Sequence, residues 1–139
     1  MASPPSLRAQ LQRILSAAAP EEGCALLLGT RDETGGPWRL RRLWPCLNVW
    51  PRPAERPRRF AIDPREQLLA QRWGRERGLE VLAHAHSHPQ SPPEPSDTDR
   101  CLCVKPALLL IQGPNGDQRL WWLADDRAPA LPLPWRMEQ

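Results

Sequence analysis

Three short, largely apolar segments, at residues 24–28, 79–84 and 107–112, most limit what this chain can fold into. Each lies next to a glycine or a proline and is too short for a buried helix, a pattern that is typical of strands in the interior of a sheet. No apolar run approaches the ~20 residues that a membrane-spanning helix needs. The sequence therefore predicts a domain built around a buried sheet, with no membrane span.

Two longer segments have the periodicity of helices that pack one face against such a sheet. In residues 6–19 the apolar side chains recur every three or four positions, and Ser6 is the expected N-cap. Asp63 and Pro64 fit the N-cap and first turn of a second helix, which we expect to run to about residue 77 and to end at Gly78. Ser96 is placed to cap a third, short helix.

The remaining segments predict how the sheet is completed. A turn at residues 30–37 predicts a returning strand over 38–44, and the Gly-Pro-Asn-Gly turn at 113–116 predicts a hairpin between strands 107–112 and 118–123. Residues 60–62 fit a further, brief strand, whereas four prolines within 45–57 exclude a regular central strand there. We therefore expect one α/β (α+β) domain over residues 1–139, with a mixed sheet flanked by helices and a loosely held, proline-rich tail at 128–139.

Composition narrows the class of partner and the compartment. The net charge is +3, and arginine supplies 18 of the 19 basic residues. The arginine-rich segment 52–59 lacks the glycine and aromatic residues of single-strand binders, so we expect a solvated loop there and no nucleic acid. The first residues lack the basic and apolar segments of an export signal, which favours a cytoplasmic protein whose four cysteines form no disulfide framework.

The three histidines of the chain stand at alternate positions, 84, 86 and 88, at the end of a predicted strand. Alternate side chains of a strand share one face about 6.5–7 Å apart, so two imidazoles can converge on one ion. A catalytic zinc site has three protein ligands and a water, and two histidines with one of the following carboxylates fit this set. The acidic residues in question are Glu94, Asp97 and Asp99. The spacing leaves open whether the pair is 84 and 86 or 86 and 88, and whether Ser96 and Asp99 form only a capping box.

At this point the sequence resembles a known family. His86-Ser87-His88-Pro89, then seven residues counted from Pro89 to Pro95, then Ser96-x-x-Asp99, is similar to the H-[ST]-H-P and S-x-x-D signature of the JAMM (MPN+/JAB) metalloproteases. The segment from Glu22 to Gly29 matches the family's glutamate seven residues before a strand-ending glycine. The resemblance extends from about residue 22 to residue 111 and is strongest to the small stand-alone prokaryotic (Mec+-like) members. It implies a JAB/MPN-like fold, related to that of the cytidine deaminases.

Carried over by position, the resemblance implies that His86, His88 and Asp99 bind one zinc ion per chain, with water as the fourth ligand. It makes Glu22 the general base for that water and Ser96 the stabiliser of the oxyanion, and it leaves His84 inside the strand as a buried histidine. A zinc deaminase is excluded because neither H-x-E nor P-C-x-x-C occurs.

The implied activity is a zinc-dependent metallopeptidase. Its expected substrate is a peptide or isopeptide bond after the C-terminal glycine of a ubiquitin-like or sulfur-carrier protein with a Gly-Gly tail. The alternative is a catalytically inactive MPN-type scaffold, which typically lacks one or more of the ligands that this sequence retains. A basic module that binds nucleic acid would instead show salt-sensitive affinity for DNA or RNA.

Overall fold

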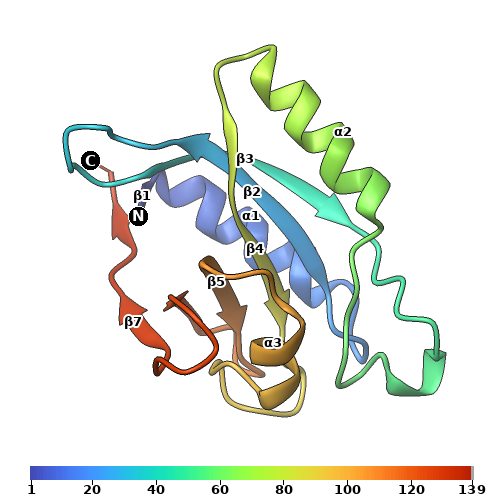
Figure 1. Ribbon diagram of the computed structural model, residues 1–139. Helices are drawn as coiled ribbons and strands as arrows, with labels where there is room; N and C mark the ends of the chain where they lie inside the picture. The colour runs from blue at the N-terminus through green and yellow to red at the C-terminus, as the bar shows by residue number, and fades with distance from the viewer. Residues whose placement is uncertain (139) are drawn as a thin grey trace.

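The computed structural model describes residues 1–138, which form one curled, mixed sheet with helices on both faces (Figure 1). In chain order the elements are β1 (Ala2–Ser3), α1 (Pro5–Ser16), β2 (Cys24–Thr30), β3 (Arg39–Cys46), the 3-10 helix η1 (Pro53–Glu55), α2 (Pro64–Arg75), β4 (Glu80–Ser87), α3 (Asp97–Leu102), β5 (Ala107–Gln112), β6 (Gln118–Leu123), β7 (Leu131–Leu133) and β8 (Arg136–Met137). Among these residues no helix is both long and apolar enough to cross a bilayer.

The strands lie in the order β7-β6-β5-β4-β2-β3-β1-β8. β4 and β5 are parallel, as are β1 and its two neighbours, and the other pairs are antiparallel. Alternate side chains of β2 divide the core: Ala25 and Leu27 pack with α1, whereas Leu26 and Leu28 pack with α2. The predicted mixed sheet flanked by helices is thus confirmed.

Local turn and cap chemistry set several element boundaries where the sequence predicted them. β5 and β6 have the predicted bounds. α2 begins after Asp63, whose carboxylate accepts a hydrogen bond from the amide of Arg65, and Gly78 follows the helix with a φ of +70°. α3 begins after Ser96, as predicted.

Other predicted boundaries were wrong. Ser6 does not cap α1, because the helix already begins at Pro5, and it ends at Ser16 rather than at residue 19. Residues 60–62 form no strand, although Ala61 accepts one backbone hydrogen bond from Val49. β3 runs on to Cys46 and includes Pro45, which the strand tolerates because β1 pairs with β3 only at Arg39.

The C-terminal tail, expected to be loosely held, instead pairs with the two outermost parts of the sheet. β7 extends the sheet beside β6, and β8 lies parallel to β1 at the opposite end of the strand order. The indole nitrogen of Trp135 donates to Ser3 Oγ over 2.7 Å, and Glu138 forms ion pairs with Arg39 and Arg41. The tail therefore curls the sheet towards closure, and Figure 1 shows it running from β7 up to the N-terminus.

A bulge in β4 determines which face the histidines occupy. Leu28 pairs with Val81 and Leu27 pairs with Ala83, so Leu82 is an extra residue between them. An extra residue reverses the alternation of side chains along a strand. His84 and His86 therefore share a face with Val81, the face on which α2 packs.

Candidate metal centre

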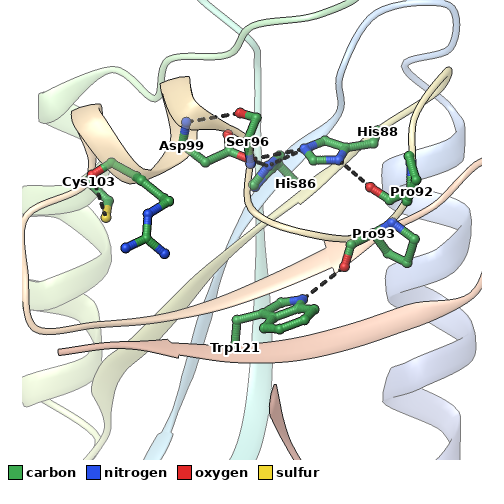
Figure 2. Close-up of polar contacts among 9 residues, drawn as sticks. His86, His88, Pro92, Pro93, Ser96, Asp99, Cys103 and Trp121 are labelled. Atoms are coloured by element: carbon green, nitrogen blue, oxygen red, sulfur yellow. Dashed lines mark hydrogen bonds and ion pairs between the residues drawn. The ribbon is translucent and has the colours of Figure 1, made fainter. Parts of the chain in front are cut away.

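Four buried residues from separate segments bring their potential ligand atoms together at one end of β4. His86 lies near the end of β4, His88 just after it, Asp99 in the first turn of α3, and Glu22 just before β2. One side-chain ligand atom from each lies within 4.8 Å of all the others. Figure 2 shows the two imidazoles directed towards the carboxylate of Asp99.

The ligand atoms of His86, His88 and Asp99 have the spacing of a tetrahedral metal site. The Nε2 atoms of His86 and His88 are 3.1 Å apart. Oδ2 of Asp99 lies 3.1 Å from Nε2 of His88 and 3.2 Å from Nε2 of His86. Ligands at the usual Zn–N and Zn–O distances of about 2.0–2.1 Å stand about 3.3 Å apart at the corners of a tetrahedron. Two neutral imidazoles and one carboxylate are also a donor set that zinc prefers, so these residues fit the ion.

The ring of His88 is oriented by the proline-rich loop at residues 89–95. Nδ1 of His88 lies 2.7 Å from the carbonyl oxygen of Pro92, so this nitrogen carries the proton and Nε2 keeps its lone pair for a metal. The loop itself is held because the indole of Trp121 on β6 donates to the carbonyl of Pro93 over 2.8 Å (Figure 2). Burial alone would lower the pKa of His88, but its hydrogen bonds to Asp99 and Pro92 outweigh this and raise it.

The ring of His86 is oriented by stacking rather than by a hydrogen bond. Its centroid lies 4.3 Å from that of Phe60, with 21° between the two planes. Nδ1 of His86 has no hydrogen-bond partner in the described part of the chain. The ring is fully buried, and burial lowers its pKa, which keeps the imidazole neutral.

Asp99 and Ser96 bind each other at the start of α3. The amide of Asp99 donates to Ser96 Oγ over 3.0 Å, and the amide of Ser96 donates to Asp99 Oδ2 over 2.9 Å, which completes a capping box. Burial opposes ionisation of Asp99, but hydrogen bonds with His86 and His88 outweigh it and hold the pKa of this carboxyl far below its usual range. The capping box therefore fixes a charged ligand, and the hydroxyl proton of Ser96 stays free.

Glu22 is held by its backbone rather than by its carboxylate. Its amide donates to the carbonyl of Arg56, and its carbonyl accepts from the side-chain amide of Asn48. The next residue, Gly23, donates its amide to Ser87 Oγ on β4 over 2.8 Å. Oε1 of Glu22 is buried without a hydrogen-bond partner among residues 1–138, and burial raises the pKa of this carboxyl to about 8. A buried carboxylate without a partner is a group that can exchange a proton with a bound molecule.

His84 lies outside this cluster, so the geometry favours the pair His86 and His88 over the pair His84 and His86. It lies instead in the wall of a cavity of about 640 Å³ that begins at the metal centre. Burial lowers the pKa of His84 to about 4. The cavity is largely apolar; its lining includes Trp50, Phe60, Ile62, Leu102 and Val104.

The supporting contacts escaped prediction from sequence. Pro92 acts through its backbone carbonyl, Phe60 is 26 positions from His86, and Trp121 is 22 positions from Asp99. Ser87 belongs to the motif, but the motif does not indicate its hydrogen bond with Gly23. A buried indole nitrogen needs an acceptor, but nothing in the sequence indicates which carbonyl provides it.

The comparisons with known proteins agree with the geometry. Residues 4–124 match the model of a family described as prokaryotic homologs of the JAB domain. The chain is similar to a desampylase of Pyrococcus furiosus, with 30% identity over 120 residues, 86% of this chain and 77% of that protein. It is also 36% identical to a probable TtuB-protein conjugate cleaving protease of Thermus thermophilus over 81 residues, 58% of this chain and 48% of that protein.

A third relative, the tail tip assembly protein K of Escherichia phage N15, is 32% identical over 83 residues, which cover 58% of this chain and 31% of that protein. The chain thus spans only about a third to a half of the length of two of these relatives. The chain is also similar to the solution structure of a Desulfitobacterium hafniense protein, with a TM-score of 0.86 and 26% identity. This match covers 99% of this chain and 92% of that one. A JAB1/MPN domain protein of Archaeoglobus fulgidus shares the fold, with a TM-score of 0.60 and 16% identity over 100% of this chain and 97% of that one. This chain therefore belongs to the family of prokaryotic JAB-domain homologues, as its motif predicted.

Proposed function

We propose that this chain is a zinc-dependent metallopeptidase that cleaves the bond after the C-terminal glycine of a ubiquitin-like or sulfur-carrier protein. The observation that carries the proposal is the buried cluster of Glu22, His86, His88 and Asp99. The names of two relatives, a desampylase and a probable protease of TtuB-protein conjugates, support a protein conjugate as the substrate class.

The chemistry follows from the position of each side chain. Zinc, when bound, supplies a Lewis acid that polarises the scissile carbonyl and lowers the pKa of a water molecule. Oε1 of Glu22 takes a proton from the attacking water and returns it to the nitrogen of the leaving amine. The hydroxyl of Ser96 donates to the substrate oxygen as that atom becomes negatively charged, an interaction worth about 2.7–4 kcal/mol for a well-placed donor.

The cavity offers a path for an extended tail. β5 pairs with β4 only from His84 to Ser87, so the first half of β4, Glu80–Ala83, has no strand partner on that side among residues 1–138. Val81, Leu82 and Ala83 line the same cavity as His86 and Asp99. A peptide that adds to this free edge as a strand would be led to the metal centre by its backbone.

Metal analysis and hydrolysis together test the proposal. We expect about one zinc ion per chain in the wild type and its loss in His88→Ala. Glu22→Gln should keep zinc but lose hydrolysis of a carrier–cysteine adduct, whereas Glu21→Gln, which changes the neighbouring carboxylate, should keep both. Absence of zinc from the wild type, or full activity of Glu22→Gln, would overturn the mechanism. A wild type that binds zinc and the carrier but hydrolyses no adduct would indicate the inactive scaffold.

A further inference from the structure

His84 is a partly buried polar side chain that the mechanism above does not use. Its ring lines the cavity between the free edge of β4 and the metal centre. Nδ1 is fully buried without a hydrogen-bond partner in the described chain. Nε2 makes no hydrogen bond there either, but this nitrogen is accessible. The accessible nitrogen is therefore free to form a hydrogen bond with a molecule in the cavity.

The burial of Nδ1 determines which nitrogen of His84 carries the proton. A buried N–H without an acceptor is rarer and costlier than an unpaired lone pair, so the neutral ring places its proton on the accessible Nε2. His84 therefore presents a hydrogen-bond donor to the cavity. Gln67 and Thr98 are further polar side chains of a lining that is otherwise dominated by apolar groups.

The strand pairing explains why a donor is needed at this position. A tail that pairs with Glu80–Ala83 cannot continue along β4, because from His84 onwards β5 occupies that edge. To reach the metal centre the tail must leave the edge and pass over the face of the sheet that carries His84 and His86. A carbonyl of the tail loses its backbone partner at that step.

We propose that Nε2–H of His84 donates a hydrogen bond to a backbone carbonyl of the bound tail, and that it thereby acts as a substrate-binding residue. His84 and His86 are two positions apart on an extended strand, about 6.5–7 Å, which is also the spacing of alternate residues in an extended peptide. The carbonyl that His84 contacts therefore belongs to the residue two positions before the glycine that is attacked. This inference rests on the proposed function.

The test compares His84→Phe, which keeps a ring of similar shape without the donor, with His84→Gln, which keeps a donor. Loss of one hydrogen bond between uncharged groups should raise KM for a carrier–cysteine adduct by about two- to tenfold, with kcat and zinc content unchanged. His84→Gln should restore KM. A short substrate that begins at the penultimate glycine lacks the contacted carbonyl, so its KM should not respond to either variant.

Binding without turnover separates this inference from the proposed function. In a Glu22→Gln background the affinity for the intact adduct, measured by calorimetry, should fall by the same factor when His84→Phe is added. Equal affinity of the two proteins, or loss of zinc from His84→Phe, would overturn the role of His84 and leave the peptidase in place. Absence of hydrolysis by the wild type would overturn the proposed function, and the role of His84 with it.

Discussion

Replacing Ser87 by alanine removes one of two hydrogen bonds that tie Gly23, the residue after Glu22, to the histidine strand; the bond from the backbone amide of Ser87 to the carbonyl of Gly23 remains. The amide of Gly23 donates to Ser87 Oγ over 2.8 Å, and both groups are buried. An unpaired buried N–H costs about 1–3 kcal/mol, so the free energy of unfolding should fall by that amount. Gly23 directly follows Glu22, and misplacement of a reacting group by about 1 Å can lower a rate by roughly 100-fold. We therefore expect Ser87→Ala to lose kcat as well as stability.

The assay pairs urea unfolding with steady-state hydrolysis of a carrier–cysteine adduct, and Ser3→Ala is the matched control. Ser3 is also fully buried and accepts a hydrogen bond, from the indole of Trp135 over 2.7 Å, but it lies in β1, away from the metal centre. Ser3→Ala should lose comparable stability and keep kcat, and Ser87→Thr, which keeps the hydroxyl, should retain both. The reasoning fails if Ser87→Ala keeps the wild-type kcat or if Ser3→Ala loses as much of it.

Three further predictions concern stability and zinc affinity. Burial raises the pKa of Glu22 to about 8, so the folded protein holds a proton that the unfolded chain releases above about pH 4.5. The metal-free wild type should therefore lose stability relative to Glu22→Gln as the pH rises from about 4.5 through 8, by roughly 1.4 kcal/mol per unit of raised pKa. The same difference in urea stability between the two proteins at pH 5 and at pH 9 would contradict this. Trp121→Phe removes the donor to the carbonyl of Pro93 and frees the loop that orients a zinc ligand, so zinc affinity in chelator competition should fall severalfold, and an unchanged affinity would count against it. Gly29→Ala places a Cβ against the carbonyl oxygen of Arg39 and should destabilise the fold by about 1–3 kcal/mol. An unchanged melting temperature in circular dichroism would contradict this and show that β3 can shift without cost.

Features that depend on neighbouring residues were predictable from the sequence. The turn at 113–116 fixed the bounds of β5 and β6, and the cap at Asp63 and the positive φ of Gly78 set the limits of α2. The spacing of the histidines left the ligand pair open, and it was the resemblance to the JAMM signature that pointed to Glu22, His86, His88 and Asp99, the four residues that the structure brings together.

Features that depend on residues far apart in the sequence could not be predicted. The bulge at Leu82 leaves no mark in a largely apolar segment, yet it decides which face carries the histidines. The sequence predicts a strand at Phe60 that does not form, and its ring instead stacks on His86, 26 positions away. The tail was expected to be loose because its prolines exclude long strands, but two short strands separated by Pro134 and Trp135 suffice to pair it.

The pairing of β8 with β1 has a consequence for how the protein is made. Ala2 is opposite Arg136, so residues at the two ends of the chain must meet before this part of the sheet exists. During synthesis that contact has to wait until residue 137 has left the ribosome, whereas every side chain of the metal cluster, from Glu22 to Asp99, emerges earlier. Contacts between residues so far apart in sequence also form slowly. β1 therefore stays without β8 while the residues of the cluster emerge, and this pairing is among the last contacts of the described sheet to become possible.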